Sequence, residues 1–145
     1  MVLSKACTYG VLASLYVAKQ SENKSYVSIR DMSNELRISF HFLTKILQKL
    51  TAEGILQSHK GPKGGILLAR EARNITILDV VLAIDGDKVF TECVLGLPGC
   101  GSERPCPMHN HWITVREDLR EMFSTKTLAA TSDDIRELGL RLSIE

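Results

Sequence analysis

The sequence SFHFLTKILQKLTAEGILQSHKGPKGGILLA, residues 39–69, joins one amphipathic helix to a short hairpin, and this combination decides the fold. Ser39 is a typical helix cap, and apolar residues follow it at helical spacing: Leu43, Ile46, Leu47 and Leu50. Gly54 then ends the helix. Residues 55–59 and 66–69 predict two strands, which the basic, glycine-rich tip KGPKGG connects.

The preceding residues predict two more helices. Residues 4–20 form an amphipathic pattern that Ser4 is placed to cap. The pair Ser28 and Asp31 resembles a capping box, with Asp in place of the usual Glu, and it opens a short helix to residue 36. Three helices followed by a hairpin are typical of a winged helix-turn-helix. The predicted fold class is therefore mainly α with a small β-hairpin.

The rest of the chain predicts a helix over 76–85, capped by Thr76 and Asp79, and a second long helix from Pro107 to about residue 123. We expect four parts: a DNA-binding domain over 1–85, a loop over 86–106, a dimerisation helix over 107–125, and a tail over 126–145 with one or two helical turns. The long helix carries a coiled-coil-like stripe, which predicts a homodimer: Trp112, Val115, Leu119 and Met122.

Charge divides unevenly along the chain. Residues 1–70 contain 10 Lys/Arg against 4 Asp/Glu, a net of +6, whereas residues 71–145 contain 8 against 13, a net of −5. A basic half favours a polyanionic partner, because cationic side chains that neutralise phosphates release counterions. No apolar run approaches the ~20 residues that span a bilayer, so we expect no membrane partner. The N-terminus shows no secretory signal, which predicts a cytoplasmic protein.

The first turns of a recognition helix contact bases in the major groove. The residues expected at bases or the nearby backbone therefore lie at the start of the helix from Ser39, whereas Lys49, further along, is expected at phosphate. The tip of the hairpin fits a minor groove or its flanking phosphates, and Ser28 lies at the start of the previous helix. The predicted DNA-contacting residues are Ser28, Ser39, Phe40, His41, Thr44, Lys45, Lys49, Lys60, Pro62, Lys63 and Gly64.

Three cysteines lie in one glycine- and proline-rich stretch. Six residues separate Cys93 from Cys100, five separate Cys100 from Cys106, and His109 follows after two more. Structural zinc sites usually contain closely spaced cysteine pairs, so a loose loop around a larger iron-sulfur cluster fits this spacing better. A zinc site and a metal-free thiol switch are the alternatives. The sequence shows no motif of an enzyme active site, so we expect no enzymatic activity.

Four stretches together resemble the Rrf2-type winged-helix transcription regulators of bacteria, over about residues 2–130. They are LSKACTYG at 3–10, GPKGG at 61–65, ITILDVVLAIDGD at 75–87, and CPMHNHW at 106–112 with the two cysteines before it. The resemblance is to the cluster-binding branch, which includes the iron-sulfur assembly regulator and the nitric-oxide-sensing repressor. It implies a homodimer that binds a double-stranded DNA operator with two-fold-related half-sites. DNA affinity would depend on a cluster that senses redox state, nitric oxide or iron status.

The resemblance also implies ligands for the cluster. Cys93, Cys100 and Cys106 match the family's three cysteines, and His109 matches the histidine that completes a two-iron cluster in the assembly regulator. The nitric-oxide sensor uses an acidic residue of the partner subunit where this chain has Thr8, and Cys7 lies one position earlier. The fourth ligand is thus His109, Cys7, His111, solvent or a small thiol. A 2Fe-2S cluster is favoured, with 4Fe-4S as the second form.

Overall fold

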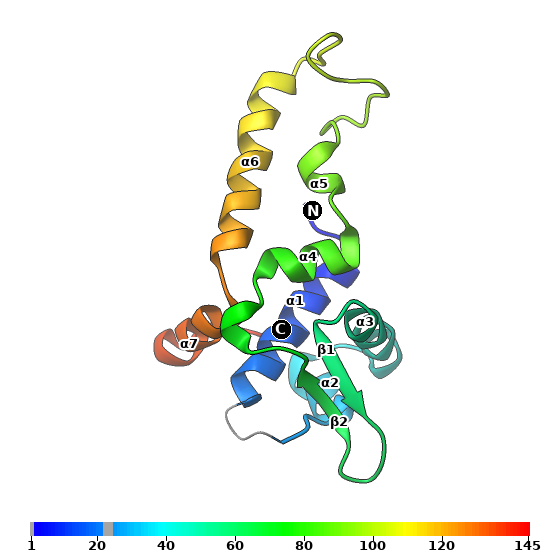
Figure 1. Cartoon of the computed structure of the whole chain (residues 1–145), viewed down its shortest axis with the longest axis vertical. Helices are drawn as coiled ribbons and strands as arrows, with labels where there is room; N and C mark the ends of the chain where they lie inside the picture. Colours follow the sequence, from blue (N-terminus) through cyan, green and yellow to red (C-terminus); the bar gives the residue numbers. More distant parts are fainter. Residues whose placement is uncertain (1, 22–24) are drawn as a thin grey trace.

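The computed structural model describes residues 2–21 and 25–145. Helix α1 (Lys5–Gln20) packs against α3, α4 and α7, and the α2 (Ile29–Leu36) and α3 (Phe40–Ala52) helices form the helix-turn-helix pair (Figure 1). Ser4, Ser28 and Ser39 cap these three helices through their hydroxyl oxygens, as the sequence predicts. The predicted apolar stripe of α3 is confirmed, because all four of its members are buried.

Strands β1 (Leu56–His59) and β2 (Gly65–Leu68) form an antiparallel hairpin, here called the wing together with its tip, in which Leu56 lies opposite Leu68. Val27 extends the hairpin on its other edge by two backbone hydrogen bonds to Ile66, of 2.8 and 2.9 Å. A mainly helical chain with a two-strand hairpin confirms the predicted fold class.

The tip of the wing is a tight turn. The Gly64 N–H donates to the Gly61 carbonyl at 3.0 Å, with Pro62 at the second position of the turn. A Cβ atom at Gly64 would lie 2.0 Å from the His59 carbonyl oxygen. Only glycine fits at this position, so the shape of the tip by itself requires Gly64.

A short 3-10 helix, η2 (Ala72–Asn74), leads into α4 (Ile77–Asp85). Thr76 and Asp79 form the predicted capping box with both reciprocal hydrogen bonds, of 2.9 and 3.1 Å. The box predicted at Ser28 is only half formed among the hydrogen bonds of the described residues: the Ser28 hydroxyl accepts from the Asp31 N–H at 3.3 Å. Because Asp79 closes both hydrogen bonds of its box, the length of the Asp31 side chain does not explain the difference.

The helices differ from the predicted ones at three places. A short helix, α5 (Lys88–Thr91), lies inside the predicted loop over 86–106. Helix α6 (His109–Thr125) begins at His109 and not at Pro107, because residues 106–109 form a turn in which the His109 N–H donates to the Cys106 carbonyl. The expected tail contains α7 (Leu128–Leu138), longer than one or two turns, since Leu128 and Ile135 are buried in the core shared with α1.

The apolar stripe of α6 is unevenly buried within the chain. Leu119 and Phe123 pack against the core of their own chain, and Trp112 is half-buried. Val115 and Met122 are each 47% exposed. Trp112 and Leu119 of the predicted seam are thus partly covered by the chain itself, whereas Val115 and Met122 stay open to a partner.

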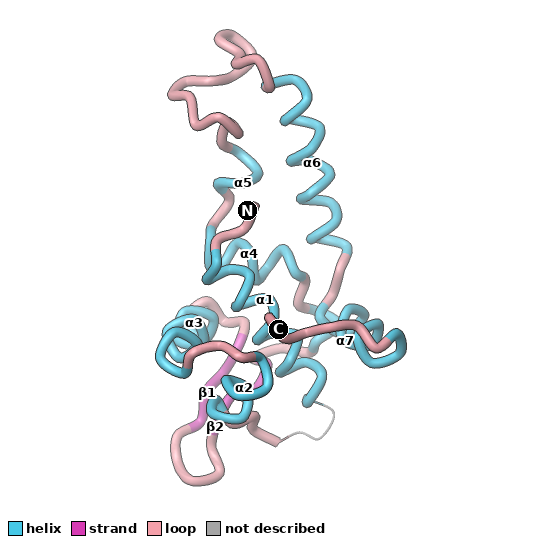
Figure 2. Tube along the Cα trace, turned by 180° about the vertical axis from the view of Figure 1, so that it is seen from behind, coloured by secondary structure: helices cyan, strands magenta, loops and turns pink. Residues whose placement is uncertain are grey.

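The two regions that carry candidate functional residues lie at opposite ends of the molecule. The residues from Cys93 to Cys106, here called the cysteine loop, lie at one end of the long axis, and the wing lies at the other (Figure 1). Seen from behind, the C-terminal residues return from α7 toward α2 (Figure 2), where the Ile144 N–H donates to the Leu36 carbonyl. None of the described helices combines the length and the apolar character that a membrane span requires.

Candidate metal centre and nucleic-acid interface

The three cysteines of the loop converge on one point. The Sγ atoms of Cys93, Cys100 and Cys106 all lie within 4.8 Å of one another, and those of Cys93 and Cys106 are 3.5 Å apart. All three side chains are half-buried and none forms a disulfide. Three free thiols at this separation form a ready-made set of soft ligands.

The backbone of the loop already favours a thiolate at one of these positions. Hydrogen bonds from the backbone at Leu97 and Leu95 lower the pKa of the Cys93 thiol to about 7. Partial burial raises the pKa of the Cys106 thiol, its close neighbour. The thiolate is the form that binds a metal. The backbone of the loop thus favours the thiolate form of Cys93.

His109 lies beside the sulfur group. Its Nδ1 atom is 3.6 Å from the Cys100 Sγ, and the Cys106 N–H donates to the same sulfur at 3.4 Å. His111 is exposed on the next part of α6. Of the histidines that the sequence nominates, the structure brings His109 to the cysteines by starting α6 at that residue.

Cys7 lies elsewhere. Its side chain is 0% exposed in the core, on the first turn of α1, and it does not belong to the group of three sulfurs. Burial, assisted by the neighbouring Asp85 carboxylate, raises the pKa of the Cys7 thiol to about 12. The Cys7 thiol is therefore held neutral and buried within its own chain, as a small packing residue is.

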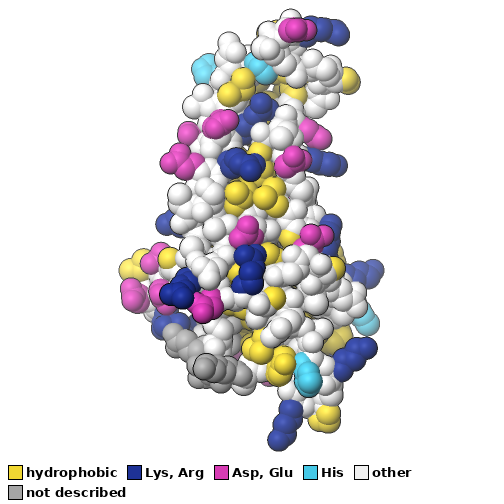
Figure 3. All heavy atoms as spheres, in the orientation of Figure 1, with side chains coloured by type: hydrophobic (Ala, Val, Ile, Leu, Met, Phe, Trp, Pro, Cys, Tyr) yellow, Lys and Arg dark blue, Asp and Glu magenta, His cyan; other side chains and the backbone are white. Residues whose placement is uncertain are grey.

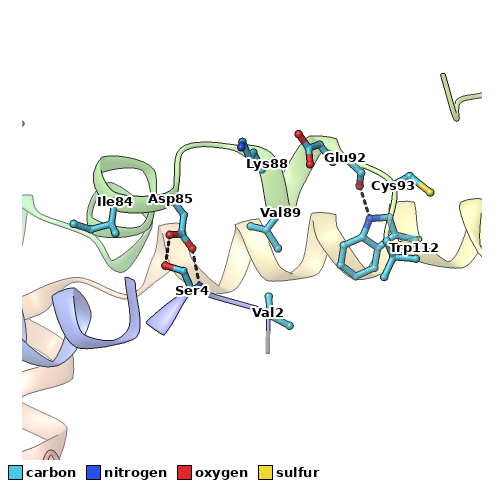
Figure 4. Close-up of a pocket in the computed structure, with 10 residues that line it drawn as sticks. Val2, Ser4, Ile84, Asp85, Lys88, Val89, Glu92, Cys93 and Trp112 are labelled. Atoms are coloured by element: carbon cyan, nitrogen blue, oxygen red, sulfur yellow. Dashed lines mark hydrogen bonds between the residues drawn. The ribbon is translucent and has the colours of Figure 1, made fainter. Parts of the chain in front are cut away.

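Helix α6 holds the start of the cysteine loop in place. The Trp112 indole N–H donates to the Glu92 carbonyl at 2.8 Å, and the Arg116 guanidinium donates to the Thr91 and Glu92 carbonyls at 3.1 and 3.3 Å. These carbonyls are at the C-terminal end of α5, where they lack partners within the helix. Figure 4 shows the Trp112 contact beside Cys93, at the edge of a pocket of about 760 Å³ that reaches back to Ser4 and Asp85.

The start of α3 is an open polar surface. Ser39, Phe40, His41 and Lys45 are exposed, and Thr44 is half-buried with its hydroxyl donating to the Phe40 carbonyl at 2.8 Å. Lys60, Pro62 and Lys63 are exposed at the tip of the wing, and Gly64 is half-buried. Lys, Arg and His side chains project from this lower part of the face shown in Figure 3, over α3 and the wing. The structure thus brings these predicted residues to one end of the molecule.

Ser28 and Lys49, two further predicted residues, also have contacts within the protein. The Ser28 hydroxyl caps α2. The Lys49 Nζ atom donates to the Ile84 carbonyl at the end of α4, at 3.0 Å. The lysine contact crosses 35 residues of sequence, so no local pattern could have revealed it.

Two aromatic contacts of this surface were not predicted from the sequence. The Arg30 guanidinium lies 5.0 Å from the centre of the Phe40 ring, at the start of α3. Tyr26 stacks on His59 with ring centres 4.9 Å apart, at the base of the wing. Arg30 follows the capping residue Ser28 by two positions, a helix-start signal that could have identified it. The Tyr26 stack depends on a pairing between distant segments.

A comparison with protein families identifies one match. The sequence model of the Rrf2 family, described as an iron-dependent transcriptional regulator, matches residues 3–134. The match includes the helix-turn-helix pair, the wing, the cysteine loop and α6.

Similar curated and solved proteins agree with this match. The HTH-type transcriptional regulator IscR of Yersinia pseudotuberculosis is 32% identical over 143 residues, 97% of this chain and 86% of that protein. The structure of IscR from T. potens has a TM-score of 0.76 at 25% identity, covering 96% of this chain and 91% of that one. CymR, the global cysteine regulator of B. subtilis, shares the fold with a TM-score of 0.74 at 22% identity, over 90% and 95% of the two chains.

Proposed function

Because the chain belongs to the Rrf2 family of transcriptional regulators, we propose that an iron-sulfur cluster on Cys93, Cys100 and Cys106 controls its affinity for operator DNA. Membership of this family makes the protein a DNA-binding regulator that resembles IscR, and not an enzyme. The observation that carries the control by a cluster is the convergence of three free Sγ atoms within 4.8 Å of one another.

The donor set fits the cluster. Thiolates are the usual ligands of iron-sulfur clusters, and an imidazole replaces a thiolate at some of them. His109 supplies an imidazole nitrogen 3.6 Å from Cys100, which supports it as the fourth ligand and favours 2Fe-2S over 4Fe-4S. When bound, an iron-sulfur cluster supplies a group whose redox state and integrity respond to oxidants, nitric oxide or iron supply.

Different elements of the chain contact different parts of the DNA. The start of α3, from Ser39 to Lys45, enters the major groove, and Arg30 beside Phe40 adds a cation at the same place. Ser28 caps α2 so that the free amides of this helix end face a phosphate. Lys60, Pro62 and Lys63 on the wing contact the backbone or the adjacent minor groove, on a tip that Gly64 keeps narrow.

The form that binds DNA is a dimer with a second copy of the chain. Met108, Val115 and Met122 are spaced seven residues apart at the start and along the outer face of α6, and they are 46%, 47% and 47% exposed. Apolar side chains at this spacing pack against a second helix. Two copies joined through α6 would present two α3 helices to two-fold-related half-sites.

The experiment compares the two states of the same protein. A random-sequence duplex library is selected with anaerobically purified protein, and the recovered duplex is then titrated with the cluster-loaded and the metal-free forms at several salt concentrations. We expect a two-fold-symmetric site whose affinity differs between the forms by about fivefold or more. Equal affinity would contradict control by the cluster.

The identity of the metal is tested alongside. A zinc ion accepts the same sulfur and nitrogen donors, and a metal-free disulfide needs only two of the thiols. Elemental analysis for iron, sulfide and zinc is therefore performed on the sample used for DNA binding. Zinc without iron, or DNA binding that responds only to thiol oxidants, would assign the loop to one of these two alternatives.

A further inference from the structure

Three helices meet at one tight junction between the cysteine loop and the DNA-reading surface. A Cβ atom at Gly10 of α1 would lie 3.2 Å from Cγ1 of Ile84 in α4 and 3.4 Å from Cγ2 of Ile46 in α3. Ile46 and Ile84 are both buried. The backbone of α1 at Gly10 therefore packs directly on the side chains of Ile46 and Ile84. A shift of α4 at this point must move its neighbours, because packed interiors transmit displacement.

Lys49 adds a polar link to this junction. From the last turn of α3 its Nζ donates at 3.0 Å to the carbonyl oxygen of Ile84, next to the C-terminal residue of α4. A cation is favourable there, since the last carbonyls of a helix are unpaired and carry partial negative charge. A small pocket of about 250 Å³, which Lys45 and Lys49 line together with Ser4 and Asp85, separates this link from the N-terminal end of α1.

Asp85, which follows Ile84, connects the C-terminal end of α4 to α1. Asp85 accepts hydrogen bonds from the Ser4 backbone N–H, at 2.9 Å, and from the Ser4 hydroxyl (Figure 4). The carboxylate thereby lies at the positive end of α1. The C-terminal end of α4 is thus joined to α3 through Ile84 and to α1 through Asp85.

A short and restrained segment connects this point to the metal centre. Between Asp85 and Cys93 the chain makes one turn at Gly86 and then forms α5, whose final carbonyls are bound by Trp112 and Arg116. This segment is too short and too restrained to absorb a rearrangement of the cysteine loop. Such a rearrangement would therefore displace Ile84.

We infer that Lys49 is a positioning residue that couples the state of the cysteine loop to the orientation of the recognition helix through the Ile84 carbonyl. This inference rests on the proposed function, and it differs from the phosphate contact that the sequence predicts for the same lysine. A phosphate contact would raise affinity equally in both forms and would add to the salt dependence. A coupling residue changes the ratio of the two affinities.

The experiment uses three full-length variants with the DNA duplex selected by the wild type. Lys49→Met keeps the aliphatic stem and removes the donor, Lys49→Arg keeps a cationic donor, and Lys45→Met is the matched control on the same helix. For each, the affinity of the cluster-loaded and metal-free forms is measured as a function of salt. Iron content and circular dichroism verify loading and folding.

We expect Lys49→Met to reduce the ratio of the two affinities by about fivefold or more, with the salt slope unchanged, and Lys49→Arg to keep most of the ratio. Lys45→Met should weaken both forms alike and reduce the slope by about one. If Lys49→Met behaves like Lys45→Met, Lys49 is a phosphate contact and the inference is overturned. A wild-type protein whose two forms bind equally would instead contradict the proposed function, and the inference with it.

Discussion

The Trp112 indole N–H donates a 2.8 Å hydrogen bond to the carbonyl of Glu92, the residue before the first cysteine of the loop. This contact fixes the α5 end against α6, so the cysteine loop and the proposed dimer helix form one unit. The chain contains a single tryptophan, which makes its fluorescence a specific reporter of this unit.

His109→Ala should destabilise the bound cluster, whereas His111→Ala should leave it intact. The reason is position: His109 Nδ1 lies 3.6 Å from the Cys100 sulfur, and His111 is exposed. The measurement is the rate of bleaching of visible absorption in air for both variants and the wild type. Equal rates for the two histidine variants would remove His109 from the ligand set.

Lys45→Ala and Lys63→Ala should each reduce the salt slope of DNA binding by about one, because each removes a cation expected at a phosphate. Both side chains are exposed, on α3 and at the tip of the wing. Lys126→Ala, an exposed lysine between α6 and α7, is the matched control and should leave the slope unchanged. A similar slope for all four proteins would place the DNA surface elsewhere.

Met122→Glu should convert the proposed homodimer into a monomer. This side chain is 47% exposed on the outer face of α6, and a carboxylate in an apolar helix seam is left without a partner. Thr114→Glu, also exposed on α6, serves as the control. Sedimentation velocity on both variants checks the result; a dimeric Met122→Glu protein would exclude this face as the interface.

The unfolding free energy should fall as the pH rises above 9, in part because of Cys7. Its folded pKa of about 12 lies above the ordinary 9.0, so its contribution is complete below pH 9 and is lost as the pH rises toward 12. The slope from one such group approaches about 1.4 kcal/mol per pH unit.

Urea unfolding under reducing conditions measures this slope. Cys7→Ala should flatten it from pH 9 upward, whereas Tyr16→Phe should flatten it only above pH 10, because burial raises the pKa of Tyr16 from 10.0 to about 12. A Cys7→Ala protein with the wild-type slope would show that the thiol titrates freely in the folded state.

The sequence predicted the winged helix well because its signals are local. Leu43, Ile46, Leu47 and Leu50 repeat at helical spacing, and the caps at Ser39 and Thr76 lie where the helices begin. It failed at α7, whose helix depends on burial of Leu128 and Ile135 against α1, more than a hundred residues away. Local patterns do not encode such contacts.

Some residues of the candidate site could likewise be predicted from the sequence, and others could not. The three cysteines and His109 could be chosen from residue type and spacing, because few other roles fit thiols in such a loop. Cys7 could not be judged from sequence, since only the packing of α1 shows that its thiol is buried. The Lys49 contact with Ile84 and the hold of Trp112 on Glu92 each join segments at least 20 residues apart, so only the folded chain reveals them.

Whether the three cysteines hold an iron-sulfur cluster is measured by anaerobic purification followed by visible absorption and native mass spectrometry of the same sample. We expect a coloured dimer whose mass exceeds that of two chains by two iron-sulfur cores, 2Fe-2S for His109 ligation. Changing Cys93, Cys100 and Cys106 together to alanine should remove both colour and added mass. A colourless protein after reconstitution with iron and sulfide, or a triple variant that stays fully coloured, would contradict a cluster on these cysteines.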